Sequence, residues 1–399
     1  MFNVIPEILY PLLRLVLPFL LLFTGTSYAA LDYSAQLVET QEAYTGLSEV
    51  YQDYFPIGAA VMSWQLDDPD LVDFILKNFK VITPEYELKE HYLMDNSQNP
   101  ANWGNFNPDH LACMDRLAAF AQEHGLKIHG HTLVWPVAET WMLWTDVTQT
   151  TLVSKEVFLQ RLDEYIGFIM MRYGDESGPY GKVIDVWDVV NEPFHYDRKW
   201  ELKQETKIFQ ICGEDFAKKA FEFAAKYAKE DDILMVNETF VEGNVAKTNN
   251  MFNCVARWKS QGLRIDAVGS QGHMGTVSTK PFDPNFCVID DLAKRCRDLN
   301  IKLGYTEIDI KVWEIDRQKT VPYETPPKWL ETWQIFKYQK FFEAMRRNKD
   351  VMTGATFWGL DDAHSVITYG PEGTLKNDWP LLFDRNGLPK QSFFAVCDF

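Results

Sequence analysis

The feature that most constrains the fold is a series of eight short apolar runs, with a longer stretch of sequence between each run and the next. The runs cover residues 57–62, 80–84, 126–135, 183–191, 233–236, 267–271, 303–310 and 354–360. Four of the stretches between them, 110–124, 157–173, 215–229 and 329–347, place apolar residues three and four positions apart, as amphipathic helices do. Strands that alternate with helices form a parallel sheet covered by helices, and eight strands close a barrel. The sequence therefore predicts an α/β fold, a (β/α)8 TIM barrel.

Most of these runs end in a polar or aromatic residue that a core strand does not need. These residues are Glu85, His131 with Trp135, Glu192, Asn237 with Glu238, His273, Glu307 and Trp358. A single residue of this kind is usually a helix cap or a solvated loop residue. In a parallel barrel, however, all strands end at the same mouth, where active sites of this architecture are built. The repetition predicts a functional site there.

Composition and charge narrow the choice of ligand. The chain of 399 residues is 46% hydrophobic and 24% charged, which is typical of a globular protein, and no linker or repeat divides it. Its net charge of −18 disfavours nucleic acid, acidic polysaccharide and anionic lipid, since binding them requires basic side chains. The 13 Trp residues exceed what a core needs, so some are expected to line a binding site. We expect a single-domain monomer with a neutral substrate.

The first 29 residues have the pattern of a secretory leader. Arg14 precedes an apolar run, residues 15–23, which is too short to span a bilayer, and Ser27 and Ala29 are the small residues that signal peptidase reads. We expect a signal peptide over residues 1–29, a catalytic domain over 30–399, and secretion to an extracellular or periplasmic space. An uncleaved N-terminal anchor is the alternative.

The six cysteines are scattered, with no CxxC pair and no Cys/His cluster, which argues against structural zinc. A disulfide between Cys287 and Cys296 and free buried thiols are equally compatible with the sequence.

Two segments carry the candidate chemistry. One apolar run ends in Asn191-Glu192, and another contains Glu307 and Asp309, which share a face because they lie two residues apart in a strand. Two carboxylates on one face repel each other unless a donor bridges them. His273, at the end of the preceding run, can bridge both through its two ring nitrogens.

Two opposed glutamates in an aromatic-rich mouth, with no metal motif, suggest glycoside hydrolysis without a cofactor. That reaction needs one carboxylic acid to protonate the leaving oxygen and one carboxylate facing the anomeric carbon, and a separation of about 5–5.5 Å implies retention of configuration. The charge of Glu307 is expected to favour the protonated form of Glu192. The flat faces of Trp135, Trp141, Trp144 and Trp358 are expected to contact sugar rings.

The motifs resemble those of the family 10 glycoside hydrolases, the retaining endo-β-1,4-xylanases with a (β/α)8 barrel. The resemblance extends from about Gly58 to Phe394. It is carried by the segments GHTLVW (130–135), WDVVNE (187–192), GSQGH (269–273), TEID (306–309), FWG (357–359) and PLLFD (380–384).

The resemblance implies a role for each matching residue. Glu192 would be the acid/base and Glu307 the nucleophile, with His273 and Asp309 holding Glu307 ionised. The remaining matches would bind the sugars: Asn191 the 2-hydroxyl at the cleaved residue, Gln271, His131, Trp135 and Trp358 the same subsite, and Glu85 and Lys89 the next sugar outward. The substrate would be xylan or xylo-oligosaccharides, cleaved at internal bonds.

Four positions depart from the family pattern. Tyr86 stands where the family usually has Asn, Pro136 and Ala138 where it has His and Gln, and Val366 where it has a second Trp. Each lost hydrogen bond to a sugar costs about 0.5–1.5 kcal/mol. Two alternatives therefore stay open: the same mechanism on another β-linked glycan or glycoconjugate, and a carbohydrate-binding barrel without catalysis.

Overall fold

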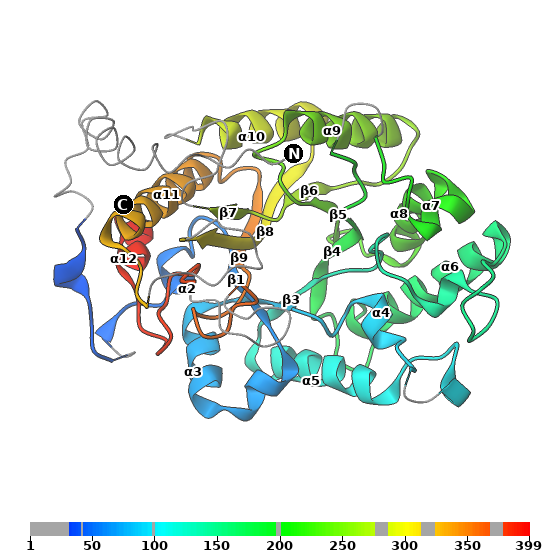
Figure 1. The fold of residues 1–399 in the computed structure, drawn as a ribbon, viewed down its shortest axis with the longest axis horizontal. Coiled ribbons are helices and arrows are strands. Elements are labelled where there is room, and N and C mark those ends of the chain that lie inside the picture. The colour runs from blue at the N-terminus through cyan, green and yellow to red at the C-terminus, as the bar shows by residue number, and fades with distance from the viewer. Residues whose placement is uncertain are drawn as a thin grey trace.

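The computed structural model describes residues 32–40, 43–97, 100–196, 201–275, 286–312, 324–367 and 378–399, so the predicted leader lies outside the described residues. Eight parallel strands form a closed barrel (Figure 1). They are β1 (Ile57–Val61), β2 (Val81–Pro84), β3 (Lys127–Gly130), β4 (Ile184–Asn191), β5 (Ile233–Glu238), β6 (Ala267–Ser270), β8 (Lys302–Lys311) and β9 (Met352–Phe357). Each strand pairs with the next, and pairing of β6 with β8 and of β9 with β1 completes the ring.

The sixth barrel strand is interrupted. After β6 the chain leaves the ladder at Gln271 and Gly272, and the short strand β7 (His273–Gly275) then pairs with the end of β8, with His273 opposite Asp309. Gly272 has φ +78°, and a Cβ there would meet the side chains of Tyr305 and Ile308 at 3.3 Å. Glycine permits this conformation and this close approach.

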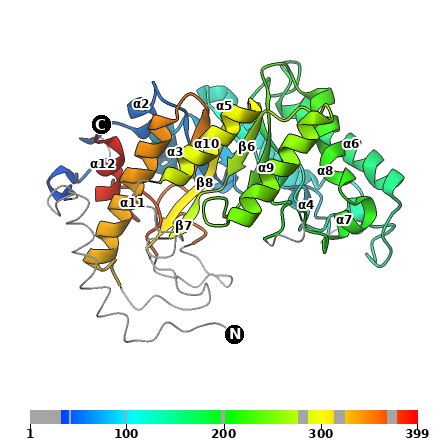
Figure 2. The same cartoon turned by 90° about the horizontal axis from the view of Figure 1, so that it is seen from above.

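Helices cover the outside of the barrel (Figures 1 and 2). The connections between successive strands contain α3 (Pro69–Asn78), α4 (Glu90–Leu93), α5 (Pro108–His124), α6 (Lys155–Tyr173), α7 (Lys207–Cys212), α8 (Asp215–Tyr227), α9 (Val245–Ser260), α10 (Cys287–Leu299) and α11 (Lys328–Arg347). The helix α2 (Leu47–Val50) precedes the barrel and α12 (Gln391–Cys397) follows it. Short 3-10 turns are η2 (Ser34–Gln36), η4 (Ser63–Asp67), η5 (Pro100–Asn102) and η6 (Trp141–Leu143).

Local sequence signals explain how these helices begin and end. Asn107 caps α5 by accepting from the backbone N–H of Asp109, and Pro108 occupies the first helical position. Gly125 ends the same helix with φ +65°, in the left-handed conformation that favours glycine. The caps of α5 thus determine where this helix begins and ends, and its apolar periodicity determines which face packs on the barrel.

The predicted barrel is confirmed, and all eight apolar runs coincide with its strands. Two runs extend several residues too far: the eighth strand ends at Phe357 instead of residue 360, and the third ends at Gly130, with residues 131–135 in a loop. Gly130, the last residue of the third strand, lies close to the buried Trp187 on β4, where a Cβ would come within 2.5 Å of Cε3. Beyond this contact the loop is held by other bonds: the Leu133 N–H donates to the Asp188 carbonyl, and the Trp135 N–H to the Glu90 carboxylate.

All six cysteines are free, so of the two alternatives that the sequence left open the structure has free thiols and no Cys287–Cys296 disulfide. Cys212, Cys254 and Cys296 are buried thiols, whereas Cys287 is exposed. A core of this size needs no covalent cross-link. Within the described ranges no helix has the length and apolar composition that crossing a membrane would require.

Candidate active site

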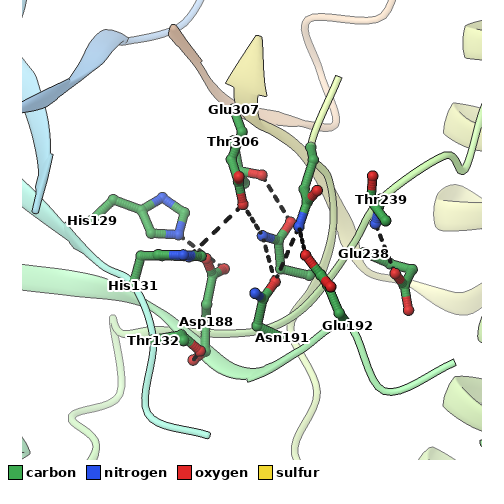
Figure 3. Close-up of polar contacts among 12 residues, drawn as sticks. His129, His131, Thr132, Asp188, Asn191, Glu192, Glu238, Thr239, Thr306 and Glu307 are labelled. Carbon is green, nitrogen blue, oxygen red and sulfur yellow. Dashed lines mark hydrogen bonds and ion pairs between the residues drawn. The ribbon is translucent and has the colours of Figure 1, made fainter. Parts of the chain in front are cut away.

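Glu307 lies inside the barrel mouth on β8, with its side chain 6% exposed. Its Oε2 is 3.1 Å from Nε2 of His273. Its Oε1 accepts a hydrogen bond of 3.0 Å from Nδ2 of Asn237, one of the dashed lines at Glu307 in Figure 3. Its backbone N–H donates to the carbonyl of Gln271. The carboxylate is thus fixed from both sides before any substrate arrives.

His273 lies between two carboxylates, as the spacing in the sequence predicts. Its Nδ1 is 2.6 Å from Oδ2 of the fully buried Asp309, and its Nε2 faces Glu307. Burial lowers the pKa of His273, but the charges and hydrogen bonds of Asp309 and Glu307 outweigh this and raise it to about 10. His273 is therefore an imidazolium at neutral pH and compensates the negative charge of Glu307.

Glu192 follows directly after β4. It has φ +53°, which is uncommon for a residue with a side chain, and its N–H donates to the Asn237 carbonyl on β5. The carboxylate Oε1 accepts a 2.8 Å hydrogen bond from Nε2 of Gln271, and its side chain is 21% exposed. The left-handed backbone turns the chain out of the sheet at the position where the carboxylate must face the cleft.

A chain of amide side chains connects the two glutamates. Gln271 donates to Glu192 and lies 3.4 Å from Oδ1 of Asn191; the same Oδ1 accepts from Asn237, which donates in turn to Glu307 (Figure 3). Thr306 donates to Oδ1 of Asn237 and so fixes which way that amide points. The two carboxylates therefore share one hydrogen-bonded floor at the mouth of the barrel.

The expected protonation of Glu192 is wrong for the unliganded protein. Burial raises the pKa of Glu192, but the hydrogen bond from Gln271 and the charges of Lys203 and Lys247 outweigh it and leave the pKa below its ordinary value. Lys203 has its Nζ 3.5 Å from Oε2 of Glu192, and its side chain is only 10% exposed. A nearby cation stabilises the ionised form, which the repulsion from Glu307 alone would disfavour.

Sequence reasoning missed Lys203. It lies eleven residues after Glu192 and reaches it because an antiparallel bridge pairs Phe194 with Leu202 and the Lys203 N–H donates to the Pro193 carbonyl. A basic residue in a polar stretch gives no local signal for such a contact.

A second histidine–carboxylate chain lies on the other side of Glu307. The Nδ1 of His131 is 2.8 Å from Oδ2 of the fully buried Asp188 and 4.0 Å from Oε1 of Glu307, and Oδ1 of Asp188 is 2.9 Å from His129. Burial raises the pKa of Asp188, but the charge and hydrogen bonds of the two histidines lower it to about 2. His131 was predicted; His129 and Asp188 were not, although His129 and His131 have the same i, i+2 spacing as Glu307 and Asp309.

Glu85 and Lys89 lie at the end of β2, beside the same cleft. Burial raises the pKa of Glu85 to about 7, with Lys89 opposing that effect, and burial lowers the pKa of Lys89 despite the charges of Glu307, Glu85 and Glu192. The Nζ of Lys89 lies 5.3 Å from the ring of Trp135 and 5.5 Å from that of Trp358. These four predicted residues therefore meet in space.

Trp358 joins this group to the catalytic carboxylates, since its ring centroid is 5.3 Å from that of His131 and 6.3 Å from that of His273. Trp141 and Trp144 behave differently: Arg161 lies over the ring of Trp141 and Lys207 over that of Trp144, which is 5% exposed. Both indoles are thus contacted by side chains of this protein, and their expected contact with sugar rings stays a prediction.

The arrangement supplies two carboxylates with different neighbours and amide donors between them. One of the carboxylates, Glu307, faces His273, which is cationic at neutral pH. Among the described residues, no group of three or more His, Cys, Asp or Glu side chains is arranged to hold a metal ion. The groups present can carry out displacement at a carbon atom with proton transfer to the leaving oxygen.

Comparison with known proteins gives matches over most of the chain. A sequence model described as Glycosyl hydrolase family 10 matches residues 46–399. The chain is 32% identical over 356 residues to Endo-1,4-beta-xylanase A of Caldicellulosiruptor saccharolyticus, covering 88% of this chain and 95% of that protein.

Two solved structures show the same fold. The crystal structure of the endo-1,4-beta-xylanase from Caldicellulosiruptor owensensis superposes with a TM-score of 0.75 at 29% identity, covering 89% of this chain and 100% of the other. An intracellular xylanase from Thermoanaerobacterium saccharolyticum, a mutant in complex with xylotriose, superposes with a TM-score of 0.73 at 27% identity, covering 89% and 99%.

Proposed function

Because the chain belongs to glycosyl hydrolase family 10, we propose that it is an endo-1,4-β-xylanase, which hydrolyses internal β-1,4 bonds of xylan with retention of configuration. The observation that carries the proposal is the pairing of Glu192 and Glu307 across one hydrogen-bonded floor, each with its own set of neighbours. The xylanase relatives and the xylotriose complex support the choice of sugar.

The first chemical step forms a covalent intermediate. The Glu307 carboxylate attacks the anomeric carbon while the proton of Glu192 passes to the glycosidic oxygen, so that the C–O bond to the leaving sugar breaks. His273, held cationic by Asp309, lies against the Glu307 carboxylate and offsets its negative charge before the attack. The first step requires the protonated form of Glu192, whereas its surroundings in the unliganded protein hold its pKa below the ordinary value.

The second step leaves Glu192 protonated and Glu307 ionised, which is the state from which the first step begins. Glu192, now a carboxylate, takes a proton from a water molecule, whose oxygen attacks the anomeric carbon and breaks the ester to Glu307. Lys203 and Gln271 favour the ionised form of Glu192, which is the form this step requires. The two steps thus need opposite protonation states of one carboxyl group, and its surroundings favour the second.

Binding of the sugar at the cleavage point falls to residues that line the mouth. We assign Asn191 to the 2-hydroxyl, Gln271, His131, Trp135 and Trp358 to the same sugar, and Glu85 and Lys89 to the next one. Lys89 lies within 5.5 Å of both tryptophan rings, so these two groups form a continuous surface. The alternative of another β-linked glycan finds no support in the comparisons.

The test is the Glu307→Ala variant on xylan and xylo-oligosaccharides. We expect hydrolysis to be abolished, and azide to restore turnover partly, with a product of inverted anomeric configuration. Azide can attack the anomeric carbon in the space that the carboxylate vacates. Wild-type rates in this variant would exclude the assignment, and chromatography of wild-type products on xylan and mixed-linkage glucan would show which glycan is cleaved.

We also propose, from the sequence alone, that the chain is exported with cleavage after Ala29. Mass spectrometry of the protein recovered from outside the producing cell tests this, and a mature N-terminus at Ala30 is the expected result. Retention of residues 1–29 would favour the anchor instead.

A further inference from the structure

We propose that His129 is a positioning residue for the hydrolysis. It acts as the cationic partner of Asp188 and thereby keeps His131 neutral, so that Nε2 of His131 accepts a hydrogen bond from a hydroxyl group of the sugar. The inference rests on the proposed function, which places His131 beside the sugar at the cleavage point, and it extends the site to a residue that none of the predicted sugar contacts includes.

The carboxylate of Asp188 contacts two histidines at once. Its Oδ2 is 2.8 Å from Nδ1 of His131 and its Oδ1 is 2.9 Å from Nε2 of His129, and none of the three side chains is more than 9% exposed (Figure 3). Against burial, which raises the pKa of Asp188, His129 contributes more than His131 to lowering it to about 2. One carboxylate carries a single negative charge, and two imidazolium groups against it would repel each other. The geometry therefore requires one cationic and one neutral histidine.

Charges on the neighbouring strands favour His129 as the cation. Burial lowers its pKa, but the charges of Asp188, Glu307 and Asp185 and the close contact with Asp188 outweigh this and raise the pKa above its ordinary value. Lys127, the basic residue at the start of the same strand, is paired with Asp185 at 3.1 Å. The ring of His129 thus faces acidic groups from both β4 and β8.

The half of the barrel opposite the mouth gives this cation a polar surrounding. His129 lines a cavity of about 160 Å³ there, whose wall includes the hydroxyl groups of Thr306, Thr353, Thr356 and Tyr305. A polar cavity of this size can hold water. Because a buried charge needs hydrogen-bonding partners, the cavity makes the charged form of His129 less costly than that of a histidine packed on all sides.

His131 has the opposite requirement. An ionised carboxylate only accepts hydrogen bonds, so the proton of a neutral His131 must lie on Nδ1, which faces Asp188. Glu307 lies 4.0 Å from the same nitrogen, but its charge is already offset by the imidazolium of His273. Among the described residues Nε2 of His131 has no hydrogen-bond partner, so its lone pair is available to a hydroxyl group.

The charge of His131 matters because the sugar becomes positively charged as it reacts. In the transition state the ring carries oxocarbenium character. A neutral imidazole that accepts from the sugar stabilises this charge, whereas a cationic one would donate and repel it. His129 therefore influences the reaction through Asp188 and His131, although it does not itself contact the sugar.

The first experiment compares His129→Gln with His129→Arg on β-xylobiosyl fluoride. Fluoride departs with little need of the acid, so kcat/KM reports formation of the covalent intermediate without the proton of Glu192. Glutamine removes the charge, and His131 then becomes the cationic partner of Asp188. We expect kcat/KM to fall about tenfold at pH 6, which corresponds to one hydrogen bond to a developing charge, and the loss to be smaller at pH 8. Arginine keeps the charge and should stay within about twofold of the wild type at both pH values.

The second experiment reads the charge of His131 without any substrate. Nuclear magnetic resonance of the protein labelled with ¹⁵N-histidine shows which ring nitrogens carry protons, and the His131→Gln variant identifies the signals of this residue by their loss. At pH 6 we expect His131 of the wild type to be protonated on Nδ1 alone. In His129→Gln it should be protonated on both nitrogens.

The matched control is His124→Gln. This variant removes an exposed histidine at the end of α5 and should leave kcat/KM, its pH dependence and the signals of His131 unchanged.

Each remaining outcome overturns the inference. A cationic His131 in the wild type at pH 6 would show that His129 is not the partner that carries the charge. Equal losses at pH 6 and pH 8 in His129→Gln, or an equal loss in His129→Arg, would show that His129 only supports the fold. A wild-type protein inactive on both the fluoride and xylan would refute the proposed function and the role in catalysis with it, while the spectrum would still decide the charge of His131.

Discussion

Replacing Asp309 by Asn tests whether His273 is cationic in the folded protein. Asp309 is fully buried, and its Oδ2 lies 2.6 Å from Nδ1 of the histidine. Asparagine keeps the size of the side chain and removes its charge. Burial then acts on the imidazole with only Glu307 to oppose it, so the pKa of His273 must fall.

The size of the effect follows from the shift in pKa. The folded pKa of His273, about 10, exceeds its ordinary value of 6.5, a difference that corresponds to at most about 5 kcal/mol of free energy of unfolding. Since the folded pKa is the higher one, this stabilisation is fully present below pH 6.5 and is lost as the pH rises through 10. Asp309 and Glu307 share it, so the variant should lose about 2–3 kcal/mol at pH 6.

The assay is equilibrium unfolding in urea, followed by tryptophan fluorescence at pH 6, 8 and 10. We expect the difference between wild type and variant to be largest at pH 6 and to vanish near pH 10, where the wild type retains a buried Asp309 carboxylate without its cation. Asp67→Asn, which removes an exposed partner of Arg116, is the control and should show no such trend. A difference that is the same at pH 6 and pH 10 would refute the reasoning.

Three further predictions concern Glu192, Lys203 and Gly130. Glu192→Ala should lower turnover of xylan about 100-fold or more. The same variant should lose much less activity on an aryl xylobioside with an acidic phenol, because that leaving group needs no proton. Equal losses on both substrates would show that Glu192 is not the general acid. Lys203→Met should move the basic limb of the pH profile of kcat/KM to higher pH, because the ammonium group 3.5 Å from Glu192, which favours the ionised carboxylate, is removed. Lys203→Arg keeps the charge and should retain the wild-type profile. Identical pH profiles in the wild type and the Met variant would contradict this prediction. Gly130→Ala should destabilise the fold by about 1–3 kcal/mol, because the new Cβ would lie 2.5 Å from Trp187, and an unchanged urea midpoint would show that the indole moves aside at no cost.

The barrel and the two glutamates could be predicted because their signals are local. Apolar runs of strand length give the eight strands whatever the tertiary contacts are, and the two-residue spacing of Glu307 and Asp309 fixes a common face. The end of the third strand could not be predicted, because the loop that follows Gly130 is held by hydrogen bonds to Asp188 and Glu90, which lie far away in the sequence.

The pKa shifts of the site residues could not be predicted from the sequence. The direction in which the pKa of Glu192 shifts depends on Lys203, in the loop after β4, and on Lys247, in α9, and neither has a fixed spacing to Glu192. His129 was within reach of the spacing rule that found Asp309, since it lies two residues before His131, but its buried partner Asp188 comes from a different strand and has no such spacing. Side chains that act over a few ångströms from separate loops are determined by the fold, and a single sequence does not display them.

The interruption of the sixth strand has a consequence for how such an enzyme can evolve. The two-residue break at Gln271 and Gly272 delivers an amide to Glu192 on one side and an imidazolium to Glu307 on the other. An insertion or deletion in this segment displaces Gln271 and His273 together, so it affects both the formation and the breakdown of the covalent intermediate. Selection can therefore adjust the balance between the two half-reactions through distant loops such as the one bearing Lys203, while the kinked segment itself is held to a fixed length.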